Sequence, residues 1–329
     1  QTFEKVIIAT GIHTIPAEIP EIYKSFSGEV IHSHYYEKNK EKFVGKKVLI
    51  IGGGETSNDM CDELAPKCDL YMSIRNGQWF QGKWVGAGEP ADLYFNRYMM
   101  YTWYPPLRNL VGFMNSFIWG KGGTGVPEWE PSVPYNQSFL TKGRECINWI
   151  SKGKLTPCSG VTHIEGGTVY FKDKKIKPDI ILLCTGYTNK HLKTLLPNGE
   201  GDLDAFKLIF NPNDISLSFC GFVRPTLGSL PMLAELQARL ISKVYSEKVH
   251  LPSNMKKVIE EDNQWRDTQL KISSSRLKYL VYYYLYCDQI AKLLGCKPNM
   301  FKLFFSDFIL WARLFFDPWI HFHYNIDSK

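Results

Sequence analysis

Three small residues with a fixed spacing, Gly52, Gly54 and Ser57, follow an apolar run in the first quarter of the chain. A dinucleotide site uses glycines at such a turn because the backbone must bend tightly and approach the pyrophosphate closely. The spacing is GxGxxS, with Ser57 where a third glycine or an alanine is usual. The pyrophosphate would bind free N–H groups near Glu55 and Thr56, where a helix is expected to begin. The alternative is a plain structural turn.

The end of the next expected strand discriminates between the two nicotinamide cofactors. An NAD site carries an acidic residue about twenty positions past the glycines, where it binds the ribose hydroxyls. Here the chain reads Ser73-Ile74-Arg75, and Arg75 lies 23 positions past Gly52. A guanidinium at this place can donate two hydrogen bonds to a 2′-phosphate. Ser73 and Arg75 therefore predict NADPH, and the alternative is a solvated arginine at a strand end.

A strand, a turn, a helix and a second strand must position these residues. β-Branched residues at 46–51 predict the first strand, residues 55–65 a helix that stops at Pro66, and residues 69–74 the second strand. This order predicts an α/β fold with a βαβ unit. We also expect strands at 179–184 and 215–223, a hairpin at 156–171, a mainly helical end of the chain, and an insert of short helices and loops at 77–134 that includes Trp79, Trp84, Trp103, Trp119 and Trp129.

The composition limits the class of protein. The chain has 329 residues, 44% of them hydrophobic and 22% charged, so it can bury cores for about two domains. Its net charge of +6 comes without a Lys/Arg-rich run, which argues against nucleic-acid binding. The eight cysteines form no CxxC pair, and the closely spaced His32 and His34 lack further ligands nearby. We therefore expect free thiols in a reducing compartment and no metal site.

The segment before the first of these strands contains the most specific pattern. Phe26, Gly28, His32 and Tyr36 fit FxGxxxHxxxY at every fixed position. Alone, His32 could equally be an interior histidine with satisfied hydrogen bonds. The pattern and its place just ahead of the glycine turn resemble the identifying motif of the flavin-containing monooxygenases and their Baeyer–Villiger relatives.

Two strand ends extend the resemblance. Ala9-Thr10-Gly11, with Pro16 after it, is similar to the strand end that precedes the motif in this family. The segment from Asp179 to Thr185-Gly186-Tyr187 is similar to the family's D-x-hydrophobic-A-T-G-Y segment, with Cys184 in place of alanine. Each could also be an ordinary turn or a hairpin cap, but their order along one chain is that of the family. Segments 221–225, 235–239 and 294–299 resemble the animal-type members, so that the likeness runs from Val6 to about Asp317.

The resemblance implies a fold of two dinucleotide-binding, Rossmann-like domains, with an NADPH domain inserted in a partial FAD domain. It puts the FAD-domain segment and linker at 1–44, the NADPH domain with its helical insert at 45–178, and the returning FAD-domain segment with a helical C-terminal extension at 179–329. His32 is expected to organise the linker without direct chemistry. The residues expected to contact the nucleotide are Gly52, Gly54, Glu55, Thr56, Ser57, Ser73 and Arg75, and those expected to pass near the cofactors are Thr10, Gly11, Thr185 and Gly186.

The activity that the resemblance implies is that of an N,N-dimethylaniline-type monooxygenase. In that family NADPH reduces FAD, molecular oxygen adds to give a flavin hydroperoxide, and this species oxygenates a soft nitrogen or sulfur nucleophile of a small-molecule substrate. The cofactor supplies the chemistry, so no catalytic triad is needed and no catalytic residue is assigned. Two alternatives stay open: a Baeyer–Villiger monooxygenase acting on ketones, and a truncated, non-catalytic nucleotide-binding protein.

The start of the sequence bears on the expected activity. The chain opens with Gln1 and enters an apolar run at 5–9 almost at once, which predicts a buried strand from the middle of a fold. The family's first GxGxxG, which binds the FAD pyrophosphate, has no counterpart in this sequence, and neither has the active-site asparagine of the animal-type enzymes. We therefore expect the chain to hold FAD weakly and to be inactive as it stands.

The C-terminal region predicts an amphipathic surface. Residues 300–317 predict one helix whose polar stripe, Lys302, Ser306, Arg313 and Asp317, interrupts an apolar circumference. The helix before it is expected at 276–294, stopped by Gly295. No uncharged stretch approaches the ~20 residues that span a bilayer. We expect peripheral contact with a membrane, by resemblance the endoplasmic reticulum; the alternative is a cytoplasmic protein whose apolar face packs on the FAD domain or in a homo-oligomer.

Overall fold

The computed structural model describes residues 2–85, 88–99, 101, 113–114, 117, 124–132, 140–188, 190, 203–226, 228–270 and 279–324. The chain divides into two compact units, each assembled from separate segments. The first unit comprises Gln1–Ile15, Glu89–Leu107 and Thr188–Lys329, and the second comprises Pro16–Gly88 and Arg108–Tyr187. Trp103 and Trp119 of the expected aromatic insert lie outside the described residues.

The second unit is built on a five-stranded parallel sheet, in agreement with the α/β fold expected from the sequence. Its strands lie in the order β10 (Leu155–Cys158), β5 (Asp69–Ser73), β4 (Lys47–Ile51), β14 (Ile180–Leu183) and β3 (Glu29–His32). Parallel sheets are covered on both faces, which is why β4 and β14 consist almost wholly of apolar residues. The predicted βαβ unit is confirmed, with helix α2 (Glu55–Leu64) between β4 and β5.

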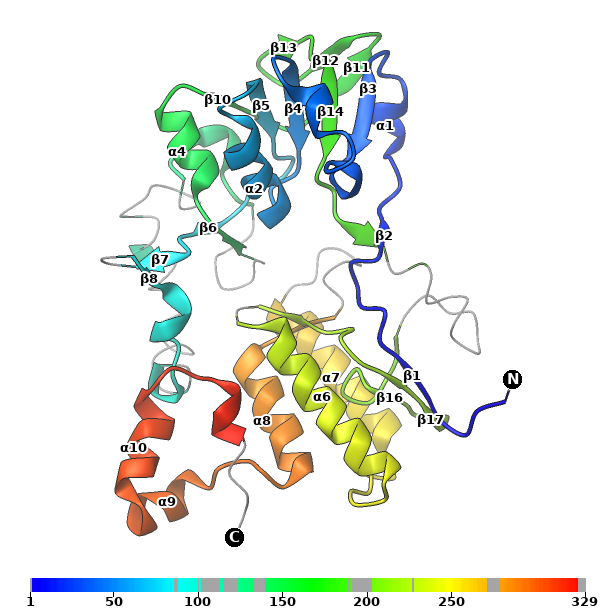
Figure 1. Ribbon diagram of the computed structural model, residues 1–329, viewed down its shortest axis with the longest axis vertical. Coiled ribbons are helices and arrows are strands. Elements are labelled where there is room, and N and C mark those ends of the chain that lie inside the picture. Colours follow the sequence, from blue (N-terminus) through cyan, green and yellow to red (C-terminus); the bar gives the residue numbers. More distant parts are fainter. Residues whose placement is uncertain are drawn as a thin grey trace. The chain divides into compact units, whose positions relative to one another are not determined.

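Two apolar clusters cover the two faces of this sheet. On one face Val48 and Ile50 pack with Cys61 of α2 and with Cys146 of α4 (Glu145–Ser151). On the other face Leu49 and Ile51 pack against α1 (Glu21–Lys24) and the small antiparallel sheet of β11 (His163–Glu165), β12 (Thr168–Tyr170) and β13 (Lys175–Ile176). Figure 1 shows α2 and α4 on one side of the sheet and α1 on the other. Alternate residues of each strand therefore supply the two cores.

The predicted hairpin at 156–171 is only partly confirmed. β11 and β12 pair as an antiparallel hairpin across Gly166-Gly167, as the glycines suggested. Residues 155–158 do not join it; they form β10, which pairs in parallel with β5. The apolar side chains of Leu155 and Cys158 explain the difference, because both are buried in the main sheet.

The sheet also extends past the limits expected for the NADPH domain, 45 and 178. β3 precedes residue 45 and β14 follows residue 178, yet β14 is hydrogen-bonded between β4 and β3. Burial accounts for this, because Ile181, Leu182 and Leu183 are fully buried on both faces of β14.

The first unit combines a small sheet with helices. β1 (Val6–Ile8), β17 (Asp214–Phe219) and β16 (Phe210–Asn211) form the sheet, and α6 (Leu230–Tyr245), α7 (Met255–Leu270) and α8 (Tyr283–Leu294) are the longest helices in the described part of this unit. The prediction that the first strand is buried was wrong: Val6 and Ile7 are 41% and 51% exposed. β1 is an edge strand that pairs with β17 alone, so one side of it has no neighbour among the described residues.

The C-terminal region forms two helices where one was predicted. α9 (Met300–Ser306) and α10 (Phe308–Phe316) are separated by Asp307, whose extended backbone has φ −153° and ψ 82°. The Asp307 carboxylate accepts a hydrogen bond from the Leu310 N–H at 2.9 Å and so begins α10. The helix expected at 276–294 ends at Leu294 as predicted, with Gly295 in the left-handed conformation, but begins only at Tyr283.

The remaining elements are short. In the described part of the aromatic insert, the expected short helices and loops are present, but three two-residue strands, β6, β7 and β8, were not predicted. The short elements are β2 (Ile15–Pro16), β6 (Phe80–Gln81), β7 (Trp84–Val85), β8 (Glu89–Pro90), β9 (Thr141–Lys142), β15 (Tyr187–Thr188), β18 (Arg224–Pro225), β19 (Leu280–Val281) and 3₁₀ turns at Ser33–Tyr35, Lys40–Phe43, Ala91–Tyr94, Pro127–Trp129 and His321–Tyr324. Of the predicted strand at 215–223, β17 accounts for the part up to Phe219.

Candidate nucleotide-binding site

The glycine turn lies at the carboxyl end of β4, between β5 and β14. The Gly52 N–H donates to the Ser73 carbonyl at 3.0 Å, and the Cys184 N–H donates to the Ile51 carbonyl at 2.9 Å. Gly52 has φ +135°, and a Cβ there would lie 2.5 Å from the Cys184 carbonyl oxygen. Both the conformation and the close approach therefore require glycine.

Cys184, which replaces the family's alanine, acts here as a small buried side chain. It is 8% exposed and belongs to the apolar cluster beneath the turn. Burial raises the pKa of its thiol to about 12, although a hydrogen bond with Ser33 opposes the rise. The thiol is therefore neutral near pH 7 and takes no part in chemistry at the turn.

The N-terminus of α2 is open to an anion. Gly54 is the N-cap residue and provides no side chain to bind the first N–H groups of the helix. A Cβ at Gly54 would meet nothing within 4 Å, and Glu55 and Thr56 are exposed. Free N–H groups at a helix N-terminus bind phosphate, and the helix dipole adds to the attraction. The turn therefore fits the dinucleotide pyrophosphate expected from the sequence.

The hydroxyls of Ser57 and Ser73 point into the protein. Ser57 is fully buried and donates to the Gly54 carbonyl at 2.6 Å. Ser73 is 3% exposed and donates to the Ser159 carbonyl at 2.7 Å. Both side chains therefore hold the backbone of the turn and of the strand end.

Two further side chains hold the turn and the helix that follows it, and neither was singled out from the sequence. Thr141 is fully buried, and its hydroxyl donates to the Gly53 carbonyl at 2.6 Å. Asn58 is fully buried too; its amide oxygen accepts the Cys146 N–H at 3.0 Å, and its amide nitrogen donates to Glu145. Both contacts join residues more than 80 positions apart, so no local pattern could have revealed them.

Arg75 lies just beyond β5, two residues after the Ser73 carbonyl that holds Gly52. Its side chain is exposed, and none of the described ion pairs involves it. The nearby Tyr23 hydroxyl is buried, which raises its pKa to about 12, while the positive charge of Arg75 lowers that pKa. Gly160 lies against Arg75, since a Cβ there would be 3.2 Å from the Arg75 Cα. The guanidinium is thus available to a ligand bound at the turn.

The two Thr-Gly strand ends belong to different units. Thr10 and Gly11 lie in the first unit, where Gly11 has φ +70° and the Thr10 carbonyl accepts the Thr14 hydroxyl at 2.6 Å. Thr185 and Gly186 lie in the second unit, directly after β14. For these four residues the structure describes the backbone that follows each strand, and their expected place near the cofactors stays a prediction.

His32 of the sequence motif holds the end of β14. Its Nε2 lies 2.9 Å from the Gly186 carbonyl, and its Nδ1 accepts the His34 N–H at 3.1 Å. These partners require the proton to be on Nε2. Burial lowers the pKa of His32, against a smaller raising effect of the Gly186 carbonyl. The side chain is therefore a neutral backbone anchor, which supports the organising role expected from the sequence.

The other motif residues pack the edge of the same sheet. A Cβ at Gly28 would lie 2.5 Å from the Phe26 ring and 2.9 Å from the Asp179 carbonyl oxygen. The Asp179 carboxylate accepts the Lys47 N–H at 2.8 Å and so ties β14 to β4. These contacts give Phe26, Gly28 and Asp179 structural roles beneath the site.

A model of the flavin-binding monooxygenase-like family matches residues 1–328. The chain belongs to this family. Members use FAD and NADPH, the two cofactors expected from the sequence, and the resemblance stated above is confirmed. Known flavin monooxygenase structures have two Rossmann-type domains, which agrees with the predicted fold class.

Proteins similar in sequence to this flavin-binding monooxygenase-like chain include a brominase and a flavin-containing monooxygenase. The chain is 31% identical to the 4-hydroxybenzoate brominase (decarboxylating) of Pseudoalteromonas luteoviolacea, over 99% of this chain and 66% of that protein. It is 27% identical to flavin-containing monooxygenase 5 of Oryctolagus cuniculus, over 99% of this chain and 63% of that protein. It therefore spans slightly less than two thirds of the length of these relatives.

Among solved structures, the chain is similar to cyclohexanone monooxygenase from Rhodococcus sp. Phi1 bound to NADP⁺. The TM-score is 0.61 at 14% sequence identity, and the match covers 88% of this chain and 73% of that chain. At this identity the likeness is one of fold.

Proposed function

We propose that this flavin-binding monooxygenase-like chain is an NADPH- and FAD-dependent monooxygenase whose second unit is the NADPH domain and whose first unit belongs to the FAD domain. The observation that carries the proposal is the open glycine turn with Arg75 beside it. Gly52 and Gly54 leave the backbone accessible, and the exposed guanidinium of Arg75 follows the strand that supports them. No described residue is assigned to FAD.

The proposed roles separate residues that bind from residues that position. Main-chain N–H groups from Gly54 to Thr56 would bind the pyrophosphate, and Arg75 the 2′-phosphate. Ser57 and Ser73, whose hydroxyls are bound to carbonyls, would hold the turn in shape. FAD, when bound and reduced by NADPH, supplies the oxygen activation. We further propose that Thr10, Gly11, Thr185 and Gly186 pass near the cofactors.

Replacing Arg75 tests the cofactor assignment. Arg75→Ala should weaken NADPH binding about ten- to a hundred-fold, because a forked, charge-assisted contact contributes roughly 1.5–3 kcal/mol. NADH binding should stay unchanged, since NADH has no 2′-phosphate. Titration calorimetry with both nucleotides measures this, and Lys46→Ala is the matched control, because Lys46 is an exposed cation at the other end of β4. Equal losses for NADPH and NADH would contradict the role of Arg75.

For the substrate, we propose a small molecule with a soft nitrogen or sulfur nucleophile, oxygenated with molecular oxygen. N,N-dimethylaniline and the cyclic thiourea methimazole are suitable probes, with NADPH consumption and product formation measured together. A flavin-saturated protein that oxidises NADPH but yields no N-oxide or S-oxide would contradict this substrate class. A protein that binds NADPH but does not oxidise it would instead favour the non-catalytic, nucleotide-binding alternative.

A second candidate reaction is halogenation. The 31% identity to a 4-hydroxybenzoate brominase favours it, since this identity exceeds the 27% to the rabbit enzyme. Bromide is itself a soft nucleophile, so the same oxygenating cofactor could act on it. Bromide with 4-hydroxybenzoate as acceptor tests this candidate, and chloride is the control. The Baeyer–Villiger alternative rests on fold likeness to cyclohexanone monooxygenase and is tested with cyclohexanone as substrate.

We also propose that α9 and α10 contact a membrane surface, by resemblance that of the endoplasmic reticulum. Phe301, Phe305 and Ile309 are 79%, 73% and 73% exposed. Exposed aromatic residues on short helices that also carry Lys302 and Arg313 suit the boundary of an anionic bilayer. Within the described residues, no helix combines the length and the apolar character needed to cross a bilayer.

Vesicle flotation separates this proposal from its alternative. The protein should float with vesicles that contain anionic lipid, and Phe305→Asp with Ile309→Asp should abolish flotation. A matched double variant at the exposed Phe113 and Phe117 should float normally. Failure of the wild type to float, with a concentration-dependent dimer that the same substitutions disrupt, would show that the apolar surface is a homo-oligomer interface.

A further inference from the structure

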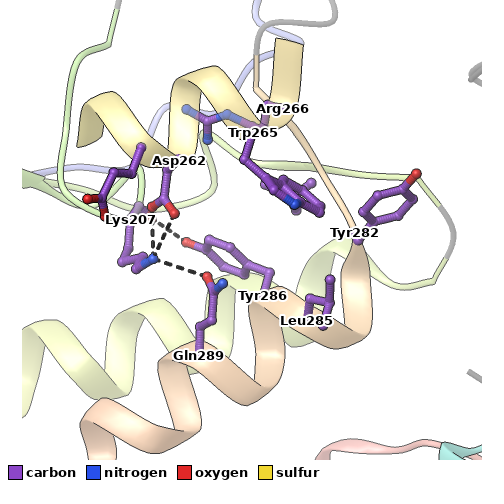
Figure 2. A pocket seen from close by; sticks show the side chains of 10 residues that line it. Lys207, Asp262, Trp265, Arg266, Tyr282, Leu285, Tyr286 and Gln289 are labelled. Carbon is purple, nitrogen blue, oxygen red and sulfur yellow. Dashed lines mark hydrogen bonds and ion pairs between the residues drawn. The ribbon is translucent and has the colours of Figure 1, made fainter. Parts of the chain in front are cut away.

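A cavity lies wholly within the first unit, between α7 and α8. Its volume is about 320 Å³, which is the lower end of the range for small-molecule sites. Figure 2 shows Lys207, Asp262 and Gln289 joined by polar contacts at one end, and the rings of Trp265 and Tyr282 at the other. None of these residues belongs to the nucleotide site, which is built from the second unit.

The apolar end of the cavity is aromatic. The rings of Trp265 and Tyr282 meet edge to face, with centroids 5.3 Å apart and an interplanar angle of 72°. Tyr282 and Tyr286 are 5% exposed, whereas Trp265 is 41% exposed and so forms the open side. Leu285 and Val281 complete this end. Such walls suit a flat, apolar group, and their ring faces attract a cation.

The polar end has spare acceptors but no spare ammonium donor. Lys207 Nζ donates to the two Asp262 oxygens at 3.1 and 2.8 Å and to Gln289 Oε1 at 3.2 Å. Three partners use all three N–H bonds of an ammonium group. Each Asp262 oxygen keeps a further lone pair, and Glu261 beside it is exposed. A ligand at this end would therefore have to donate hydrogen bonds.

The charged side chains that line the cavity balance one another. Among the described residues, Lys207 and Arg266 are the positive groups of the cavity. Arg266 is 9% exposed, and burial lowers its pKa, while Asp262, Asp267 and Asp204 lie close enough to raise it. Of the residues that line the cavity, Glu261 and Asp262 are acidic and balance the two cations, so a preference for a cation comes from the acceptor oxygens at the polar end.

The backbone that presents Lys207 is strained and tightly held. Lys207 and Leu208 have φ +53° and +57°, values that non-glycine residues rarely adopt. The Tyr286 hydroxyl donates to the Lys207 carbonyl and accepts from Gln237 Nε2 at 2.7 Å. The polar end of the cavity is thus fixed before any ligand arrives, which lowers the entropic cost of binding.

We propose that this cavity binds a small aromatic amine in its ammonium form. The ring would lie against Trp265 and Tyr282, and the ammonium group would donate to Asp262 and Glu261. Nothing in this proposal depends on NADPH, on FAD or on the oxygenation reaction, so it can fail or hold independently of them.

Titration calorimetry on the full chain without nucleotide or flavin tests the proposal. The probe is 2-phenylethylamine at pH 7, with 3-phenylpropionate as the anion of similar shape and 2-phenylethanol as the neutral one. We expect a dissociation constant on the order of 1 mM for the amine. The anion and the alcohol should bind at least about tenfold more weakly, because they lack the charge-assisted donors. Equal binding of all three, tighter binding of the anion, or undetectable binding of the amine would overturn the proposal.

Variants locate the site. Asp262→Asn should weaken amine binding about tenfold and Trp265→Leu about three- to fivefold. Glu261→Gln, at an exposed position, should weaken amine binding less than Asp262→Asn does. This variant leaves the Lys207–Asp262 ion pair intact, so a loss of binding would not come from breaking that pair. The matched controls are Asp69→Asn and Trp84→Leu, both exposed and both in the second unit. If Trp265→Leu and Glu261→Gln fold normally and bind the amine like the wild type, the amine binds elsewhere and the assignment is wrong.

Discussion

The interiors of the two units differ in the charge that they bury. In the second unit, the central strand β4 is apolar, and Val48, Leu49 and Ile50 are fully buried between two apolar clusters. In the first unit, a buried site holds the charged pair Arg97 and Asp288, which are 1% and 4% exposed. The sheet core depends on shape and volume, whereas the charged site depends on which partners are present and which are protonated.

The charged site is densely connected. Arg97 Nη1 donates to the two Asp288 oxygens at 3.0 and 3.2 Å, and the guanidinium carbon lies 4.2 Å from the centre of the Trp319 ring. Burial alone would raise the pKa of Asp288, but its partners hold it below the usual value. Two further nitrogens of Arg97 have no hydrogen-bond partner among the described residues. The other groups bound to Asp288 are Tyr101, Tyr324 and Lys297.

The largest expected effect comes from neutralising Asp288. Asp288→Asn leaves the buried Arg97 without its counter-charge and turns an acceptor oxygen into a donor amide facing other donors. Loss of one partner of a buried ion pair costs about 3–5 kcal/mol of unfolding free energy. Urea denaturation measures it, with Asp214→Asn, at an exposed position of the same unit, as the control. A loss below about 1 kcal/mol would show that the site contributes little and that the two interiors do not differ as described.

The stability of the first unit should fall in mild acid because of His323. This side chain is 6% exposed, and burial, together with the charge of Arg97, lowers its pKa to about 4. Between about pH 6.5 and 4, the His323 imidazole is protonated in the unfolded chain but neutral in the folded chain. The unfolding free energy therefore falls as the pH falls through this range. The full loss is roughly 3 kcal/mol.

Denaturation of wild type and His323→Asn at several pH values tests this. The variant should remove most of the slope between about pH 6.5 and 4, while His250→Asn, at an exposed position of the same unit, should keep it. The carboxylate of Asp288 loses its stabilising charge only at lower pH, since its pKa is already held down. An unchanged slope in His323→Asn would mean that another group causes the acid sensitivity.

A smaller loss of stability is expected from replacing the glycines after two strands, Gly52 and Gly11, with alanine. Gly52→Ala forces φ +135° on alanine and places a Cβ 2.5 Å from the Cys184 carbonyl oxygen. It should cost on the order of 1–3 kcal/mol and weaken NADPH binding at least about tenfold, because the turn must move. Gly11→Ala has φ +70° and meets nothing within 4 Å, so it should cost about 1 kcal/mol and spare NADPH binding. Equal effects on NADPH binding would contradict the assignment of the site to the second unit.

The sequence predicted where strands form better than it predicted which strands pair with one another. Residues 6–8 and 48–51 are similar apolar runs, and both lie in strands. Among the described residues, β4 has neighbouring strands on both sides and β1 on one. A run of apolar residues indicates that a strand forms but does not say which strands lie beside it. For the site, the tight turn at Gly52 could be predicted from the spacing because it depends on local backbone, whereas the binding roles of Gly54 and Arg75 stay predictions. Thr141 and Asn58 were not readable, because their contacts form only when distant segments fold together.

The smallest expected effect concerns Asp307, where the sequence predicted one continuous helix. The Asp307 carboxylate accepts the Leu310 N–H at 2.9 Å, and its own N–H donates to the Leu303 carbonyl at 2.8 Å, so this residue ends α9 and begins α10. Asp307→Ala removes the cap, at a cost of about 1 kcal/mol, but also supplies the residue with the highest helix propensity.

The two consequences can be separated by measuring helix content and stability together. If the cap alone causes the break, Asp307→Ala should raise the helical circular-dichroism signal while the unfolding free energy falls by no more than about 1 kcal/mol. Asp307→Asn should change neither, because asparagine is an equally good N-cap residue. If Asp307→Asn also joins the helices, the charge of Asp307 near the start of α10 matters more than its hydrogen bond. If neither variant changes helix content, packing of Trp311 and its aromatic neighbours fixes the break, and the cap is its consequence.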